Sequence, residues 1–268
     1  MQSVQTLNIA SLQHYIEVAG ASAQEEFGSR WFRGVGSSEF TLSPSIHRNA
    51  TITSAESLFT MEEKFLSRFK ERSIPYLTHR LSDEWEFLFL MQHYGMPTRL
   101  LDWTENPLTA LFFGVSSVAR NPAGEPDKDV AVWVLSPVTW NETIFSSRSY
   151  RGGALSPSDT MIAQSYKPGG DLRYINEYPV AILGIHNSPR IVAQRGSFCL
   201  FGKSLKPMEQ IFSEGTFHQE TLKKLIIPKA NVDGLLRQLI SMGVSDAAVY
   251  PDLEGLARET KRIFGYRV

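Results

Sequence analysis

The stretch QHYGMPTRLLDWTENPLTALFF, residues 92–113, joins two apolar segments through a dense run of polar side chains. The candidate site residues within it are His93, Tyr94, Thr98, Arg99, Asp102, Trp103 and Thr104. Polar groups on a connection between core helices have to be hydrogen-bonded, either within the fold or by a ligand. Two interpretations stay open: an Asp102–Arg99 ion pair, with Trp103 as its apolar anchor, shapes the connection, or the stretch lines a binding site.

Apolar residues recur at helical spacing on both sides of this stretch. Before it, Ser82 is the expected N-cap of a helix that ends near His93. After it, Asn106 is the expected N-cap of a second helix, with Pro107 at the first helical position, where a missing N–H costs nothing. We therefore expect an irregular connection over residues 94–105, between two helices of the core.

Periodicity in the rest of the chain predicts an α+β fold. Helices are expected at residues 11–19, 58–69, 232–240 and 253–264. Strands are expected at residues 30–34, 130–135, 179–186, 190–193, 197–201, 222–228 and 247–250. Residues 141–174 lack periodicity and are expected to form a functional loop or lid. The pattern predicts a single domain, with a leading helical segment at 1–28 and a core at 29–268 that has a mixed or antiparallel sheet and flanking N-terminal helices.

Composition and motifs exclude several classes of protein. The 27 Lys and Arg residues nearly balance the 28 Asp and Glu residues, which gives no global argument for nucleic acid or an anionic membrane and leaves room for a local basic cleft. The single Cys199 lies among apolar neighbours and is expected to be buried. No apolar run is long enough to span a membrane, and no secretory signal is recognised, so we expect a cytoplasmic protein.

Motifs of the common enzyme classes are absent from the sequence. It contains no GxGxxG, P-loop, HExxH or GxSxG motif, so Rossmann dehydrogenases, common NTPases, zincins and serine hydrolases have no support. The histidines show no metal-ligand spacing, and we predict no metal site.

Two further polar groups stand next to glycines in predicted strands. Arg33 and Gly34 end the strand WFRG, and an arginine fork there matches phosphate or carboxylate oxygens while the glycine permits close approach. The alternative is an arginine that pairs with a buried acid to fix the fold. Gln194 and Gly196 interrupt two strand patterns at 189–198, where the glutamine either bonds a ligand or occupies a turn.

Together these motifs resemble the FRG-domain family, which is named after its Phe-Arg-Gly motif. The matching pieces are WFRG at 31–34, SPS and HR within 43–48, QHYGMPTRLLDWTENPLTALFF at 92–113, PRIVAQRGSF at 189–198 and YPDLEGLA at 250–257. They follow one order and cover nearly the whole chain. The resemblance implies a bacterial or phage setting, with a toxin or phage-defence role.

A more distant resemblance is to arginine-type ADP-ribosyltransferases, and it implies an ADP-ribosyltransferase-like fold that uses NAD as its substrate. Under it, Arg33 and Gly34 hold the NAD phosphates, and Gln194 takes the position of the catalytic acid and contacts the ribose. Glutamine supplies no full charge to stabilise the ribosyl cation. Either another acid acts, with Asp102 the best-placed candidate by composition, or the reaction is weak or absent. Thr98, Arg99, Asp102 and Thr104 wall the cleft, and Trp103 or Tyr94 offers a stacking face.

The leading hypothesis is therefore an NAD-dependent ADP-ribosyltransferase that modifies an unidentified macromolecular acceptor. A second hypothesis is a nucleotide-binding or nucleic-acid-end-binding module that has the same cleft without turnover. A third is a hydrolase in which His93 acts as the base and Asp102 orients it, which needs the two side chains within hydrogen-bond reach. The oligomeric state does not follow from the sequence.

Overall fold

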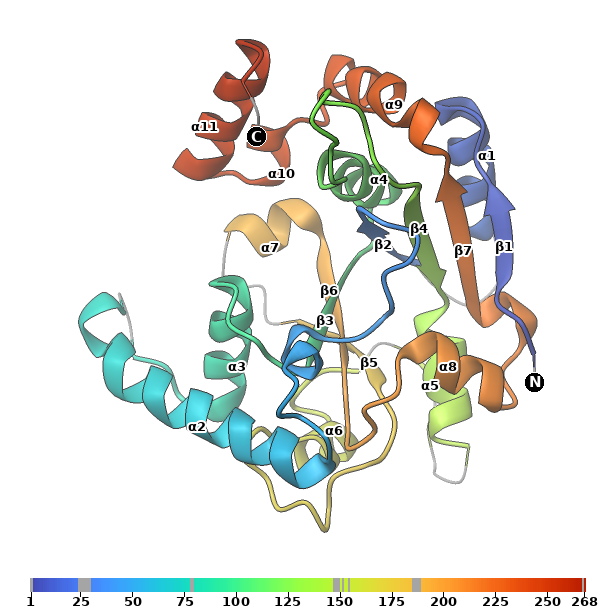
Figure 1. Cartoon of the computed structure of the whole chain (residues 1–268). Helices are drawn as coiled ribbons and strands as arrows, with labels where there is room; N and C mark the ends of the chain where they lie inside the picture. Colours follow the sequence, from blue (N-terminus) through green and yellow to red (C-terminus); the bar gives the residue numbers. More distant parts are fainter. Residues whose placement is uncertain are drawn as a thin grey trace.

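A sheet of seven strands forms the centre of the molecule in the order β1-β7-β4-β2-β3-β6-β5 (Figure 1). The computed structural model describes residues 2–23, 30–77, 80–146, 150, 152–153, 155–184, 189–266 and 268. The described strands are β1 Gln5–Asn8, β2 Trp31–Val35, β3 Leu100–Thr104, β4 Val130–Leu135, β5 Val180–Leu183, β6 Gly196–Leu200 and β7 Leu222–Ile227. The pair β1–β7 is parallel and the other neighbours are antiparallel, which confirms the predicted mixed core.

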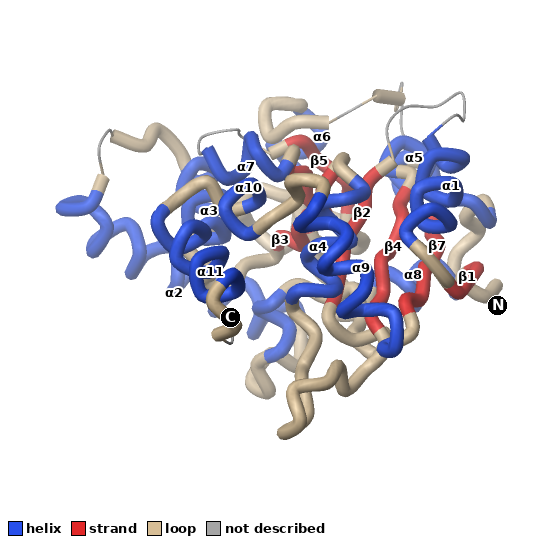
Figure 2. Tube along the Cα trace, turned by 90° about the horizontal axis from the view of Figure 1, so that it is seen from above, coloured by secondary structure: helices blue, strands red, loops and turns tan. Residues whose placement is uncertain are grey.

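Helices cover both faces of this sheet (Figures 1 and 2). The longer helices are α1 Leu12–Ala23, α2 Ala55–Ser73, α3 Glu84–His93, α4 Pro107–Ser116, α9 Lys229–Ser241 and α11 Leu253–Ile263. The shorter ones are α5 Pro137–Ile144, α6 Thr160–Ser165, α7 Pro189–Gln194, α8 Met208–Glu214 and α10 Asp246–Val249, with 3-10 turns η1 Ser45–Arg48, η2 Ile74–Tyr76 and η3 Gln219–Thr221. All of the helices predicted from periodicity are confirmed.

One face of the sheet, here called the α4 face, carries two separate apolar clusters. Strand register places Phe32, Val134 and Thr104 on the same side, because residues paired across antiparallel strands point the same way. On β2, β4 and β7 this face packs against α1, α4 and α9. On β3, β6 and β5 it packs against α3 and α6, with Phe89 of α3 edge-on to Phe198 of β6 at 5.1 Å.

The opposite face, here called the α8 face, holds the second large core. Trp31, Trp133 and Trp103 lie in one cluster with the apolar side chains of α5 and α8. Cys199 of β6 lies in the same cluster with no exposed surface, and burial raises the pKa of its thiol. The expected burial of this cysteine is confirmed.

The central stretch differs most from its prediction, because residues 100–104 form strand β3 rather than an irregular connection. The alternation of apolar and polar residues in this strand covers only residues 101–104, which is the shortest run by which a half-buried strand is recognised. The helix ends around it are as expected at Asn106, which caps α4 with Pro107 at the first position. At the other helix the cap is Asp83 rather than Ser82, since the Asp83 side chain accepts from the amides of residues 85 and 86.

Three further predictions are wrong. Residues 190–193 belong to helix α7, where Ile191 is buried while Val192 is 56% exposed, and residues 246–249 form helix α10, which Ser245 caps. The segment 141–174 is not a lid in its described part, because Ile162 and Tyr166 are fully buried in the cluster beneath α3. A short run of β-branched residues does not distinguish a strand from one turn of helix. The end of the strand predicted at 179–186 lies outside the described residues.

Candidate functional site

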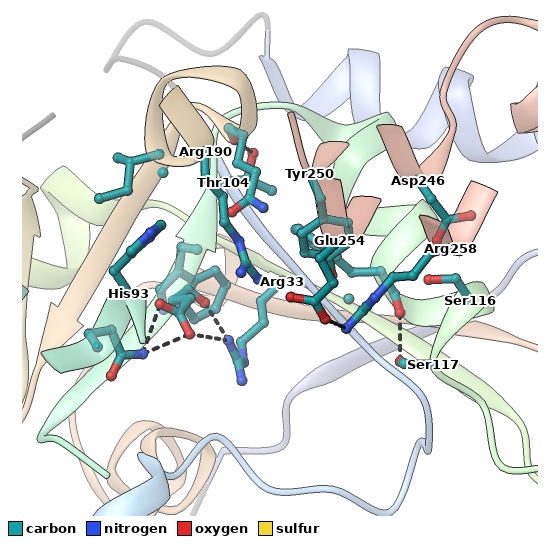
Figure 3. Close-up of a pocket in the computed structure, with 18 of the residues that line it drawn as sticks. Arg33, His93, Thr104, Ser116, Ser117, Arg190, Asp246, Tyr250, Glu254 and Arg258 are labelled. Carbon is teal, nitrogen blue, oxygen red and sulfur yellow. Dashed lines mark hydrogen bonds and ion pairs between the residues drawn. The ribbon is translucent and has the colours of Figure 1, made fainter. Parts of the chain in front are cut away.

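A cavity of about 710 Å³ opens on the α4 face, between α4 on one side and α3 and α7 on the other (Figure 3). We call it the first cavity. Its floor contains Gly34, Asp102, Thr104 and Phe198, which share one face of β2, β3 and β6 by register. Helices α10 and α11 close the far side. The gap between the two apolar clusters of this face is therefore where the polar residues gather.

Strands β2 and β3 separate beneath the cavity. Among the described residues, β2 and β3 pair at Phe32 and Thr104 alone, whereas all five residues of β2 pair with β4. Alternate carbonyls of β3 bond β6, so the carbonyl of Asp102 faces β2. The Arg33 guanidinium donates to that oxygen at 2.6 Å and lies 3.9 Å from the Asp102 carboxylate. Arg33 thus occupies the gap in the sheet and also lines the cavity.

A chain of hydrogen bonds holds the Asp102 carboxylate. The Thr98 hydroxyl donates to the side-chain oxygen Oε1 of Gln92 at 2.5 Å, and Nε2 of the same Gln92 side chain donates to both Asp102 carboxylate oxygens at 2.9 Å. Thr98 is only 1% exposed, whereas the Asp102 side chain is 56% exposed. Thr98 therefore does not wall the cavity as predicted; it orients Gln92, which in turn orients an accessible acid.

Gly34 and Thr104 border the first cavity for structural reasons. A Cβ on Gly34 would lie 1.7 Å from the carbonyl oxygen of Ala110, so the glycine lets α4 pack directly on β2. The hydroxyl of Thr104 donates to the Gln194 carbonyl oxygen and accepts from the Asn106 amide. The Gln194 side chain donates to the Val249 carbonyl oxygen at 3.1 Å, which ties α7 to α10 beside the cavity.

Arg99 is a correction to the prediction. Its side chain has no exposed surface, and it bonds both carboxylate oxygens of Glu62, at 2.7 and 3.1 Å. It also donates to the carbonyl oxygens of Phe201 and Tyr166, and it lies over the Phe59 ring at 4.5 Å. Arg99 therefore joins α2 to the body of the fold and does not face the cavity. The expected Asp102–Arg99 pair is replaced by Asp102–Arg33 and Glu62–Arg99.

Trp103 is a second correction. It is 3% exposed, and its ring lies in the core of the α8 face, because neighbouring residues of a strand point to opposite sides. Its ring is therefore not available for stacking in the cavity. Tyr94, the alternative, is 71% exposed at the rim of a neighbouring cavity and lies edge-on to the His93 ring at 4.9 Å.

His93 ends α3 and lines both cavities. Burial lowers the pKa of its imidazole, the charge of Arg190 adds to that lowering, and Asp252 opposes it. Burial and the Arg190 charge therefore favour the neutral form of the ring. A His–Asp hydrolase needs this imidazole to be oriented by Asp102, whose two oxygens both accept from Gln92 and keep lone pairs for a further donor. The hydrolase stays a hypothesis.

The C-terminal wall supplies charged residues that the sequence did not single out as functional. Tyr250 lies between two guanidinium groups, with Arg190 at 4.4 Å and Arg258 at 5.0 Å from its ring centroid. Arg258 pairs with Glu254, and Arg262 pairs with Asp246 (Figure 3 labels Asp246, Tyr250, Glu254 and Arg258). The motif YPDLEGLA contains Tyr250 and Glu254. Its resemblance to the FRG-domain family was the one sequence feature that could have indicated a functional role for this wall.

The predicted residues thus divide into three groups. Those that line the first cavity are Arg33, Gly34, His93, Asp102, Trp103, Thr104 and Gln194, although Trp103 directs its ring away from it. Tyr94 lines the neighbouring cavity, and Thr98 and Arg99 line neither. Over the described ranges, no group of three His, Cys, Asp or Glu residues could hold a metal, and no helix is long and apolar enough to cross a membrane. His79 and His186 lie outside those ranges.

Comparison with protein families shows that the model of the FRG domain matches residues 28–122. This range contains β2, α2, α3, β3 and α4, and with them Arg33, Gly34, His93 and Asp102. Gln194 and the C-terminal wall lie beyond it. Neither the curated proteins nor the solved structures give a match.

Proposed function

We propose that this chain, which carries an FRG domain over residues 28–122, binds NAD or a related nucleotide in the first cavity and transfers ADP-ribose to a macromolecular acceptor. One observation carries the proposal. Arg33, Asp102 and Gln194, which come from β2, β3 and α7, line the same cavity. Arg33 and Gln194 are the residues that the resemblance to ADP-ribosyltransferases picks out, and Asp102 is the acid chosen by composition. Arg99, which was expected to line the same cleft, is buried in the core instead.

The charge of the cleft supports an anionic ligand. Six cationic and four anionic side chains line the first cavity and its neighbour: Arg33, Arg48, Arg190, Arg258, Lys261 and Arg262 against Asp102, Asp246, Asp252 and Glu254. The chain as a whole has a formal charge of −1, so this excess of positive charge is local. Guanidinium groups that converge on a cavity favour phosphate oxygens, which match their planar fork.

Asp102 is the proposed catalytic acid in place of Gln194. In the transfer, the bond between the ribose C1′ and nicotinamide breaks, nicotinamide leaves with the bonding electrons, and an acceptor nucleophile bonds to C1′. Positive charge develops on the ribose meanwhile, and a fixed carboxylate stabilises it. Gln92 and Thr98 hold the Asp102 carboxylate in one orientation, whereas the Gln194 side chain is already engaged with Val249.

The setting in which the activity operates is part of the same proposal. The family resemblance supports a bacterial toxin or phage-defence protein of the cytoplasm. A nucleotide-binding module without turnover is the alternative, and the accessible, oriented carboxylate of Asp102 favours the enzyme over it.

Nicotinamide release from NAD tests the proposal. We expect the purified protein to release nicotinamide, and we expect Asp102→Asn to lower the rate by about 100-fold or more, the scale of losing one electrostatic group in an active site. Asp171→Asn is the matched control, because Asp171 is an exposed acid that pairs with Arg173 and lines neither cavity. Binding of NAD without nicotinamide release supports the binding module. The absence of both binding and release contradicts the proposal.

A further inference from the structure

A second cavity of about 530 Å³ shares a wall with the first. The shared wall consists of Arg33, Gln92, His93, Asp102, Arg190 and Glu254. Beyond that wall the second cavity is bounded by the turn η1, which contributes Ser45 and Arg48, and by the residues that follow α3. Three arginines from separate elements therefore border it: Arg33 of β2, Arg48 of η1 and Arg190 of α7.

These three guanidinium groups have hydrogen-bonding capacity to spare. A guanidinium carries five N–H donors. Within the described ranges, Arg33 uses one nitrogen toward the Asp102 carbonyl, and its Nε is buried without a partner. Arg190 contacts the face of Tyr250, and neither it nor Arg48 forms an ion pair with a described residue. Guanidinium groups that line one cavity and have donors without acceptors favour an anionic ligand, whose oxygens match their planar fork.

The acids around the second cavity are already engaged. Glu254 pairs with Arg258 at 2.5 Å, and the Asp252 carboxylate caps α11 by accepting from the Gly255 amide at 2.8 Å. Asp102 lies 3.9 Å from Arg33 and accepts from Gln92. Burial lowers the pKa of Arg33, Asp102 opposes this, and the charge of Arg48 adds to the lowering. Two cations that repel each other across a cavity gain most from an anion between them.

We infer that Arg33, Arg48 and Arg190 together bind a phosphate or diphosphate group in the second cavity. The inference deepens the proposed function and rests on it for the identity of the nucleotide. It assigns Arg48 and Arg190 to the binding of phosphate oxygens. It also places Asp102 on the wall between a phosphate subsite and the larger first cavity, where a ribose and its ring have room.

Isothermal titration with inorganic pyrophosphate tests this site directly on the whole chain. We expect binding by the wild-type protein, and we expect Arg48→Gln to weaken it by about 10- to 100-fold, the scale of a lost hydrogen bond to a charged group. Arg237→Gln removes the same charge from an exposed position on α9 that lines neither cavity, and it should bind as wild type does. Equal affinity in the Arg48 and Arg237 variants, or no binding at all, overturns the inference.

Competition with NAD identifies the source of the phosphate. Competitive binding of pyrophosphate and NAD shows that the site holds the diphosphate of the nucleotide, and simultaneous binding shows that it holds a second, phosphate-bearing molecule such as the acceptor. Nicotinamide release with an unchanged KM in the Arg48 variant overturns the inference and leaves the proposed function intact. Pyrophosphate binding that depends on Arg48, in a protein that neither binds nor cleaves NAD, supports the anion site and contradicts the proposed function.

Discussion

Replacing Glu62 with glutamine tests whether Arg99 belongs to the core rather than to the binding site. Arg99 and Glu62 are 0% and 1% exposed, and both carboxylate oxygens accept from the guanidinium. Glutamine keeps the size of the side chain and removes its charge. One of its two terminal atoms becomes an amide nitrogen, which then faces a guanidinium nitrogen without an acceptor between them.

Breaking a buried pair by neutralising one partner costs about 3–5 kcal/mol, because the remaining charge stays buried without compensation. The bonds from Arg99 to the carbonyl oxygens of Phe201 and Tyr166 persist in Glu62→Gln, so we expect the lower end of that range, about 3 kcal/mol. The matched control is Glu39→Gln, which breaks an ion pair with Lys128 whose side chains are 69% and 46% exposed. An exposed pair of this kind contributes about 1 kcal/mol or less.

Urea unfolding, followed by tryptophan fluorescence, measures both changes in the free energy of unfolding. A loss of less than about 1 kcal/mol in Glu62→Gln, or equal losses in the two variants, refutes the assignment of Arg99 to the core.

Two further predictions concern Gly34 and His47. Gly34→Ala should lower the free energy of unfolding by at least about 3 kcal/mol, because its Cβ would lie 1.7 Å from the Ala110 carbonyl oxygen. Gly20→Ala, at an open position of α1, should instead raise it by about 0.5–1 kcal/mol. Thermal unfolding of both variants measures this difference, and equal effects contradict the prediction. Burial, with the charge of Arg99 adding to it, lowers the pKa of His47 from 6.5 to about 4, so its contribution to stability is constant above pH 6.5 and is lost as the pH falls toward 4. Urea unfolding at pH 4 and pH 7 measures how much stability is lost at low pH, and His47→Phe should reduce that loss by up to about 3 kcal/mol. An unchanged pH dependence in the variant contradicts the lowered pKa of His47.

The sequence predicted the helices well and the central strand badly. The start signals at Asn106 and Pro107 act locally, so the start of α4 follows from the residues themselves. Strand β3 depends instead on pairing with β2 and β6, which are distant in the sequence, and its alternation of apolar and polar residues covers only residues 101–104. A strand of this kind is recognised from its neighbours rather than from its own pattern.

The site was predicted in outline and not in its details. Arg33, Asp102 and Gln194 line one cavity as expected, whereas Arg99, three residues from Asp102, points into the core. The position of a residue along the stretch does not tell whether it lines the cavity or lies in the core, because the partner of Arg99 is Glu62 on the distant helix α2. Arg190 and Tyr250 reach the cavity through the packing of the short helices α7 and α10 and of helix α11, which no local sequence pattern predicts.

The melting temperature of the protein in rising concentrations of NAD tests the central claim most directly, that the first cavity binds a nucleotide. A ligand at about 100 times its Kd stabilises the folded state by about 2.7 kcal/mol. For a chain of this size, each kcal/mol raises the melting temperature by roughly 2–4 °C. We predict a saturable rise of about 5–10 °C with NAD that Arg33→Ala abolishes. An unchanged melting temperature at millimolar NAD, or an equal rise in the Arg33 variant, contradicts the claim.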